Sequence, residues 1–289
     1  MYAKPHLAAV RPYVPGYQPE RPDVVKLNSN ENPYPPSPNV KKALATLDCD
    51  RLRRYPEASC SGLRRMIADR YGVEITTLWT GMPGRYVWDF IEGPSTIGLV
   101  PPETRQERLA VLKKGADFAR RVGVPSITTH VGFIPENPAD PLYTGVVAAL
   151  REIAAYCAAN GQSFWFETGQ ETPVTLLRTI EDVGAANLGI NLDPANLLMY
   201  GKANPVDALD IFGTYVRGVH AKDGEYPTNG RALGVEKPLG EGRVNFPALV
   251  AKLKALNFNG ALTIEREISG PQQIADIQRA KRLLEELIR

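Results

Sequence analysis

Beyond residue 74 the chain alternates short β-rich runs with longer helical patterns, and this alternation restricts its fold more than any other feature. Each run is rich in apolar and β-branched residues, and each connecting segment is long enough for a right-handed crossover. This order predicts parallel strands covered by helices in an α/β domain. The six runs are Ile75–Trp79, Ser126–His130, Ser163–Glu167, Leu188–Leu192, Val216–Ala221 and Ala261–Glu265.

The connecting segments have the spacing of amphipathic helices, and several begin with proline near the first turn. They cover residues 103–122, 141–160, 173–183, 205–214, 246–257 and 271–288. Units of this length are typical of a TIM-type barrel, in which about 250 residues close eight parallel strands. Because residues 75–289 supply six such units, the sequence predicts a TIM-barrel-like domain that is truncated by two βα units.

The first 74 residues have a different composition and predict an irregular, Pro-rich extension. Ten of the 25 prolines lie in the first 56 residues, and residues 28–38 are too rich in proline for a helix or a central strand. Short helices are predicted at Val40–Leu47 and Ser61–Tyr71. Residues 1–74 carry a net charge of +4 and residues 75–289 a net charge of −2, so we predict two domains that meet near residue 74.

The overall composition argues against several classes of protein. Its 34 basic and 32 acidic side chains leave a net charge of +2, whereas a nucleic-acid binder needs a dense basic face. Three cysteines without a CxxC pair fit a reducing compartment. The start of the chain lacks the apolar region of a secretory signal, and no apolar run approaches the length of a membrane span. We therefore expect a cytoplasmic protein with no nucleic-acid or membrane partner.

Four of the predicted strands end in a side chain that can bind a metal ion. Glu167, His220 and Glu265 lie at the ends of apolar runs, and Asp193 directly follows one. Because the carboxyl ends of parallel strands meet at one mouth of a barrel, three carboxylates and one imidazole would surround a single divalent ion. This donor set suits Mn²⁺, Mg²⁺ or Co²⁺.

Each of these side chains, taken singly, has a simpler explanation. Glu265 lies beside Arg266 and could form a surface ion pair, and Asp193 precedes Pro194 and could form a turn. Four such residues, all at strand ends and all after apolar runs, favour one common site.

Five motifs at these strand ends resemble those of the sugar phosphate isomerase/epimerase family, the xylose isomerase-like TIM barrels. The resemblance covers residues 75–289 in the family's order. Its motifs are T-H-V-G-F at residues 129–133, F-E-T-G-Q-E at 166–171, L-D-P-A-N at 192–196, V-H-A-K-D at 219–223 and T-I-E-R-E at 263–267. By this resemblance Glu167, Asp193, His220 and Glu265 match the metal ligands, and Glu167 and Glu265 also match the catalytic acid/base pair.

The resemblance implies a metal-dependent isomerase or epimerase of carbohydrate metabolism that acts on a sugar or a sugar phosphate. A divalent ion can polarise a substrate carbonyl, and two carboxylates can remove a proton from the neighbouring carbon and return it to the other carbon or the other face. The outcome is aldose–ketose isomerisation or epimerisation.

Four further residues are candidates for substrate binding. His130 could donate to a substrate oxygen, although a histidine at a barrel mouth can be purely structural. Asn196 stands where related DNA-repair endonucleases place a zinc-binding histidine, which favours one metal over three. Lys222 could reach a substrate hydroxyl or phosphate, and Trp79 could form an apolar wall. The loop at residues 239–243 could wrap a phosphate, but its GxG pattern more often marks a turn.

Residues 26–73 resemble a second family, through the N-terminal arm of histidinol-phosphate aminotransferases. The similarity rests on K-L-N-S-N-E-N-P-Y at residues 26–34, R-Y-P at 54–56 and G-L-R-R-M-I-A at 62–68. It implies that Tyr55 matches the tyrosine that reaches the cofactor phosphate of a partner subunit. No later segment resembles that family's phosphate loop, pyridine-binding Asp or Schiff-base lysine, so we expect neither pyridoxal phosphate nor aminotransferase activity.

The missing units leave two hypotheses about activity. Six strands do not close an eight-strand barrel, so the first and last strands would expose edges that can pair with another subunit in a homo-oligomer. All four proposed ligands lie on retained strands. The chain is therefore either an active isomerase or epimerase, or a catalytically impaired chimera that keeps the metal site without a complete substrate pocket. A nuclease of the same superfold would need further His and Asp ligands and a basic rim.

Overall fold

The computed structural model describes residues 37–46 and 72–289, which belong to two separate units. The smaller unit contributes one described helix, α1 (Pro38–Ala45), which confirms the helix predicted at Val40–Leu47 and begins two residues earlier. Tyr55 and the helix predicted at Ser61–Tyr71 lie outside the described residues. The domain boundary near residue 74 stays a prediction.

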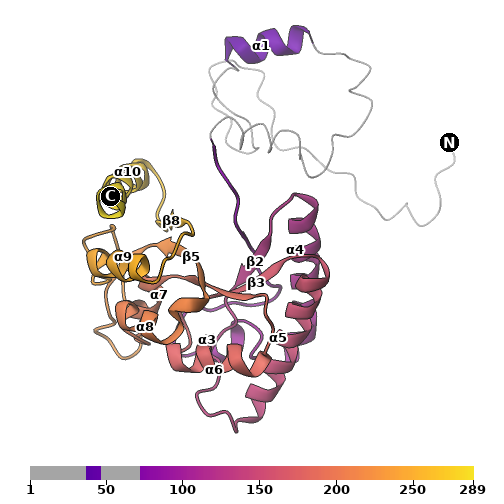
Figure 1. Ribbon diagram of the computed structural model, residues 1–289. Helices are drawn as coiled ribbons and strands as arrows, with labels where there is room; N and C mark the ends of the chain where they lie inside the picture. The colour runs from indigo at the N-terminus through magenta and orange to yellow at the C-terminus, as the bar shows by residue number, and fades with distance from the viewer. Residues whose placement is uncertain (1–36, 47–71) are drawn as a thin grey trace, which may run out of the picture. The chain divides into compact units, whose positions relative to one another are not determined.

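Six parallel strands form one sheet in the larger unit (Figure 1). In sheet order they are β1 (Leu78–Trp79), β2 (Ser126–Thr129), β3 (Ser163–Glu167), β4 (Leu188–Leu192), β5 (Val216–Ala221) and β8 (Leu262–Ile264). All six predicted runs form strands, and their order in the sheet follows their order in the chain. The two edge strands are the shortest, because in the described part of the chain each has a pairing partner on one side only.

Helices connect the strands as the sequence predicts. They are α3 (Gly93–Thr96), α4 (Pro102–Arg121), α5 (Pro141–Ala159), α6 (Pro173–Val183), α7 (Pro194–Met199), α8 (Pro205–Phe212), α9 (Phe246–Ala255) and α10 (Pro271–Ile288). Asp140, Thr172 and Asn204 accept backbone N–H groups in the first turns of α5, α6 and α8, which satisfies donors that a helix start leaves unpaired.

Five short elements were not predicted. Besides α3 and α7, the chain forms a 3₁₀ turn at Gly213–Tyr215 and an antiparallel pair of strands, β6 (Asp223–Gly224) and β7 (Glu236–Lys237). Each of these elements has too few residues to show a hydrophobic period, so sequence patterning does not reveal it.

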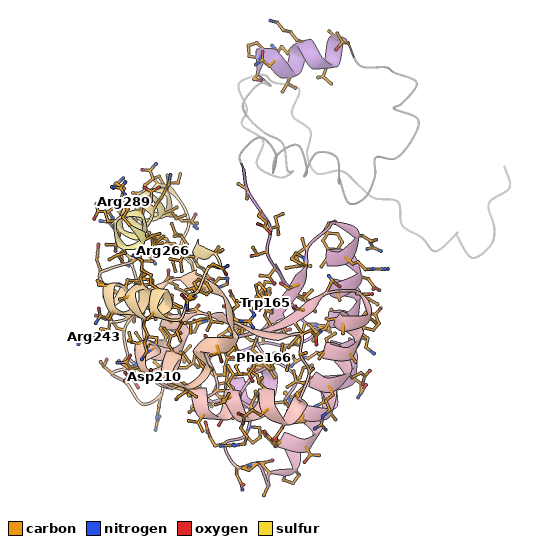
Figure 2. All side chains as sticks on the ribbon, in the orientation of Figure 1. Trp165, Phe166, Asp210, Arg243, Arg266 and Arg289 are labelled. Atoms are coloured by element: carbon orange, nitrogen blue, oxygen red, sulfur yellow. The ribbon has the colours of Figure 1, made fainter. Side chains whose placement is uncertain are left out.

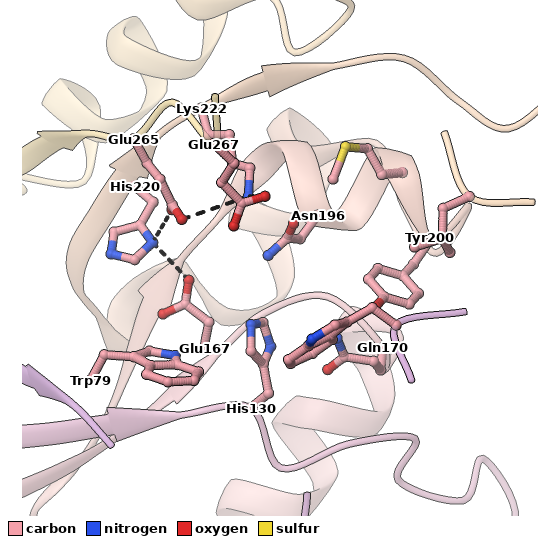
Figure 3. A pocket seen from close by; sticks show the side chains of 13 residues that line it. Trp79, His130, Glu167, Gln170, Asn196, Tyr200, His220, Lys222, Glu265 and Glu267 are labelled. Atoms are coloured by element: carbon pink, nitrogen blue, oxygen red, sulfur yellow. Dashed lines mark ion pairs between the residues drawn. The ribbon is translucent and has the colours of Figure 1, made fainter. Parts of the chain in front are cut away.

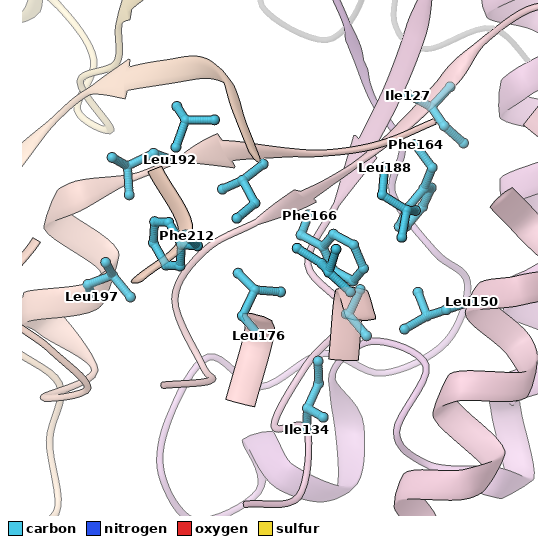
Figure 4. Close-up of a cluster of buried hydrophobic side chains, with 14 of the residues drawn as sticks. Ile127, Ile134, Leu150, Phe164, Phe166, Leu176, Leu188, Leu192, Leu197 and Phe212 are labelled. Atoms are coloured by element: carbon cyan, nitrogen blue, oxygen red, sulfur yellow. The ribbon is translucent and has the colours of Figure 1, made fainter. Parts of the chain in front are cut away.

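Aromatic and aliphatic side chains pack between the sheet and the surrounding helices (Figure 4). The Phe164 and Phe166 rings of β3 meet edge to face with centroids 5.4 Å apart, and Leu150 of α5 and Leu176 of α6 belong to the same cluster. Phe166 lies within the mass of packed side chains in Figure 2. This packing fixes β3 and β4, whose carboxyl ends carry two of the proposed ligands.

The sheet stays open between β1 and β8 in the described residues, so the fold is an incomplete TIM-type barrel, as the sequence predicts. Apolar side chains beside the β1 edge are exposed: about half of the surface of Val73, Ile75 and Trp79 is accessible to solvent. A closed barrel would bury these positions under neighbouring strands.

One described helix, α5, is long and apolar enough to cross a membrane by length and composition. Its buried side chains pack against α4, α6 and β3, while Arg151 and Glu152 are exposed on its other side. These contacts are those of a core helix covering a sheet.

The segment between β1 and α4, which carries Trp88, is held by the buried side chain of Arg108. Its guanidinium donates to the carbonyl oxygens of Gly98 at 2.7 Å and Thr96 at 2.8 Å, and at 3.3 Å to those of Pro83 and Arg85. A buried Arg that donates to several carbonyls holds them in place, because its planar guanidinium fixes the directions of its N–H groups.

Replacing Arg108 by Met removes these donors while keeping most of the side-chain volume. We expect the free energy of unfolding to fall by about 2–4 kcal/mol, because the buried carbonyls lose charged partners. Urea denaturation measures the change. Arg120→Met, at an exposed position of the same helix, serves as the control and should change stability by less than about 0.5 kcal/mol; equal effects of both variants would contradict this role of Arg108.

Candidate metal centre

The four predicted ligands come together at the carboxyl ends of four neighbouring strands. Glu167 is the last residue of β3, Asp193 follows β4 as the N-cap of α7, His220 lies near the end of β5, and Glu265 follows β8. One potential ligand atom from each side chain lies within 4.8 Å of the other three. This spacing is comparable with that of oxygen and nitrogen ligands around one divalent ion.

The contacts within this group are those of side chains that share a cation. His220 Nδ1 lies 2.8 Å from Glu167 Oε1 and 2.6 Å from Glu265 Oε2 (Figure 3). One ring nitrogen carries at most one hydrogen, so it cannot donate to both carboxylates. Asp193 Oδ2 is buried and has no hydrogen-bond partner among the described residues, with Lys222 Nζ 3.6 Å away. A divalent ion fits this donor set.

Hydrogen bonds from neighbouring groups hold the two innermost carboxylates in place. Asn191 Nδ2 donates to Glu167 Oε2 at 2.6 Å, which leaves Oε1 toward His220. The backbone N–H of Asn196 donates to Asp193 Oδ1 at 2.9 Å, which leaves Oδ2 unpaired. Such outer partners orient metal ligands before the ion binds.

The electrostatics without an ion are strongly coupled. Burial opposes the charged form of His220, but its contacts with Glu167 and Glu265 outweigh burial and raise its pKa to about 11. Burial alone would raise the pKa of Glu265, yet His220 and Lys222 lower it to about 2. Burial raises the pKa of Asp193 to about 7. The His220 proton thus takes the place of a cation between the carboxylates.

Three of the four side chains, those of Glu167, His220 and Glu265, line a cavity of about 560 Å³. The four residues predicted to bind substrate, His130, Asn196, Lys222 and Trp79, all line it. Besides Trp88, five further lining residues were not selected for substrate binding by sequence reasoning: Gln170, Met199, Tyr200, Leu233 and Glu267. Of these, Gln170 had a recognisable signal, since it lies three residues after Glu167 in a strand-end motif.

Lys222 is buried and surrounded by acids. Its Nζ lies 3.0 Å from Glu267 Oε2, 3.6 Å from Asp193 Oδ2 and 3.7 Å from Glu265 Oε1. Burial disfavours its charge, but these carboxylates outweigh burial and raise its pKa. The Lys222 ammonium therefore neutralises the acidic mouth of the barrel.

The loop at residues 239–243 is a structural turn. Asp223 accepts the backbone N–H groups of Gly240 at 2.9 Å, Gly242 at 3.1 Å and Val244 at 3.1 Å. Because the chain's own carboxylate occupies these donors, they do not form a phosphate cradle.

His130 is held at the centre of the cavity against Trp88, with the two rings edge to face at 5.1 Å. Burial lowers the pKa of His130, so the ring is neutral at neutral pH and offers one donor and one acceptor. Its Nδ1 has no hydrogen-bond partner among the described residues.

Metal binding should be coupled to proton release. Because His220 has a raised pKa without the ion and must lose its proton to act as a ligand, Mn²⁺ affinity should rise roughly tenfold per pH unit between pH 6 and 8. Isothermal titration calorimetry in buffers of different ionisation enthalpy measures the released protons. His220→Ala should weaken binding at least about 100-fold, and the exposed Asp210→Asn should leave it unchanged; pH-independent affinity would contradict the site.

Glu171, next to Gln170, gives a second pH dependence. Burial raises its pKa to about 8, so the folded state binds this proton more tightly than the unfolded state, and stability falls as pH rises from about 5 to 8. Glu171→Gln should be more stable than the unmodified protein by about 1–3 kcal/mol above pH 8, with no difference below pH 4. Urea unfolding across this range tests it, with the exposed Glu181→Gln as control; parallel pH profiles would refute the assignment.

Comparison with known proteins finds two separate similarities. Histidinol-phosphate aminotransferase from Brachyspira hyodysenteriae is 45% identical over 73 residues, which are 25% of this chain and 21% of that protein. The chain thus spans about a fifth of the length of that aminotransferase. The predicted likeness of a short segment to these enzymes is confirmed.

The larger similarity is to xylose isomerase-like TIM barrels. A xylose isomerase domain protein from Planctomyces limnophilus shares 40% identity and a TM-score of 0.74, over 78% of this chain and 82% of that chain. Two more distant structures share the fold. A D-tagatose 3-epimerase-like protein is 21% identical, with a TM-score of 0.61, over 80% of this chain and 83% of that chain. A xylose isomerase-like TIM barrel protein from Mycobacterium smegmatis, in complex with magnesium, is 19% identical, with a TM-score of 0.56, over 85% of this chain and 80% of that chain. The family profile described as xylose isomerase-like TIM barrel matches residues 43–287. The chain therefore belongs to the xylose isomerase-like TIM barrel family.

Proposed function

We propose that this protein is a divalent-metal-dependent isomerase or epimerase of a sugar. The observation that carries the proposal is the meeting of three carboxylates and one imidazole, with ligand atoms within 4.8 Å of one another, where three of the four side chains line a cavity of about 560 Å³. Membership of the family and the fold shared with an epimerase-like protein support the same reaction class.

Glu167, Asp193, His220 and Glu265 are the residues that would hold the ion, with Mn²⁺, Mg²⁺ and Co²⁺ as the ions that match oxygen-rich donors. Bound there, the ion supplies positive charge that stabilises negative charge developing on substrate oxygens as a proton leaves the adjacent carbon. Asn191 keeps Glu167 in position through its amide.

Glu167 and Glu265 are suited to move the proton. They come from β3 and β8 and approach His220 Nδ1 from two sides (Figure 3), so each can act on a different side of a sugar bound over them in the cavity. One carboxylate removes a proton, and the other returns a proton to the opposite face or to the neighbouring carbon. Glu265 is the more accessible, with 29% of its side chain exposed against 2% for Glu167.

The charges of the cavity favour a sugar without a phosphate group. Lys222 is the single lysine or arginine among the described residues that line the cavity, and three carboxylates already surround it. Phosphate recognition normally uses free arginine, lysine or backbone N–H groups, and Asp223 occupies the N–H groups of the nearby glycine loop.

A second hypothesis, a metal-binding protein with impaired turnover, is supported by the open edge between β1 and β8. Trp79 of β1 lines the cavity and is nevertheless 47% exposed, so the described residues leave this side of the cavity without a wall. Exclusion of water contributes to proton-transfer catalysis, and an open wall would weaken it.

Exchange of substrate protons with solvent separates these hypotheses. With Mn²⁺ bound, the protein should exchange a carbon-bound proton of D-fructose, D-tagatose or L-ribulose in D₂O, as NMR detects. Glu167→Gln and Glu265→Gln should each slow exchange by about 10²–10⁴-fold, while the exposed Glu285→Gln behaves normally. Tight Mn²⁺ binding without exchange on any ketose would favour the impaired chimera, and absence of metal binding would refute both hypotheses.

A further inference from the structure

Gln170 is a buried amide that the proposed chemistry does not use. It is 1% exposed and lines the cavity. Its Oε1 lacks a hydrogen-bond partner among the described residues, while its amide N–H side faces the Tyr200 hydroxyl and lowers the pKa of that group. Burying an unpaired amide oxygen costs free energy, so this side chain calls for a polar partner that enters the cavity.

The loop that carries Gln170 is held rigidly behind β3. A Cβ atom at Gly169 would lie 3.2 Å from Asn196 Cβ and 3.6 Å from His130 Cε1, so the backbone passes tightly between these two side chains. Only a residue without a side chain fits this approach comfortably. Gln170 lies in the part of the cavity beside Tyr200, across His130 from Glu167, His220 and Glu265 (Figure 3).

This part of the cavity is formed in advance by packed aromatic rings. Tyr200 is buried and meets Phe90 and Phe133 edge to face, with centroids 6.1 Å and 5.8 Å apart. Fixed rings beside an unpaired amide oxygen form a binding surface whose geometry does not depend on the ligand, and such preorganisation is typical of specific small-molecule sites.

Resting on the proposed function, we propose that Gln170 is a specificity-determining residue that binds a hydroxyl of the sugar chain at carbons beyond the reacting pair. A primary amide offers a donor and an acceptor side by side. A hydroxyl group can use both at once, whereas a phosphate or carboxylate oxygen can use only the donor. The subsite therefore reads the position and configuration of a hydroxyl at the end of the sugar away from the ion.

Binding measurements on the full chain loaded with Mn²⁺ test this assignment. Dissociation constants for D-fructose, D-tagatose and L-ribulose, which differ in hydroxyl configuration and chain length, are measured by calorimetry for the unmodified protein and for Gln170→Leu. We expect Gln170→Leu to weaken the tightest-binding ketose about 10- to 100-fold and to reduce the differences among the three. Gln170→Glu keeps the size and an acceptor, and should recover part of the selectivity.

Three outcomes decide the matter. Unchanged ketose affinities in Gln170→Leu would overturn the inference alone, because the amide would then bind only water. A fall in Mn²⁺ affinity together with equal weakening of all ketoses would show a structural role and overturn it as well. Failure of the unmodified protein to bind any ketose would overturn the proposed function, and this subsite with it. Gln106→Leu, at an exposed position of α4, is the matched control and should bind as the unmodified protein does.

Discussion

Repulsion among carboxylates at the mouth of the barrel is the constraint on which the rest of this structure depends. Glu167 and Asp193 are almost fully buried, and Glu265 reaches the same point. Burying three acids so close together is tolerable only with compensating positive charge. Without an ion, a protonated His220 and the Lys222 ammonium provide that charge. A divalent cation would supply it more directly, because Asp193 Oδ2 has no hydrogen bond and only the Lys222 ammonium 3.6 Å away.

The sequence predicted the ligands and the strands for the same physical reason. A parallel strand that is buried on both faces has an almost continuous apolar sequence, so a polar residue at its carboxyl end is easy to recognise. Sheet order then follows chain order, so Glu167, Asp193, His220 and Glu265 converge once the strands are parallel. Strand order alone was therefore enough to predict that these four side chains come together.

The residues that sequence reasoning missed owe their roles to contacts with parts of the chain that are distant in the sequence. Gln170 looks like an ordinary loop amide until the burial of both its polar atoms is seen. The glycine loop looked open to an anion, but Asp223 fills it from a position 17 residues earlier than Gly240. Arg108 reads as an ordinary helix cation, yet it is buried among backbone carbonyls. In each case the contact that determines the role of the residue joins distant parts of the chain, and hydrophobic periodicity does not predict such contacts.

The open edge and the metal centre are nearly independent features of the fold. Glu167, Asp193 and His220 lie at the ends of β3, β4 and β5, each of which is paired on both sides. Their positions are fixed by strands whose hydrogen bonds do not involve the edge beyond β1. Glu265 is different, because β8 is itself an edge strand and the Glu265 backbone N–H is tied to Ala221 of β5 at 3.2 Å. The interior of the sheet therefore holds Glu167, Asp193 and His220, whereas Glu265, which follows an edge strand, is the proposed ligand that the sheet restrains least.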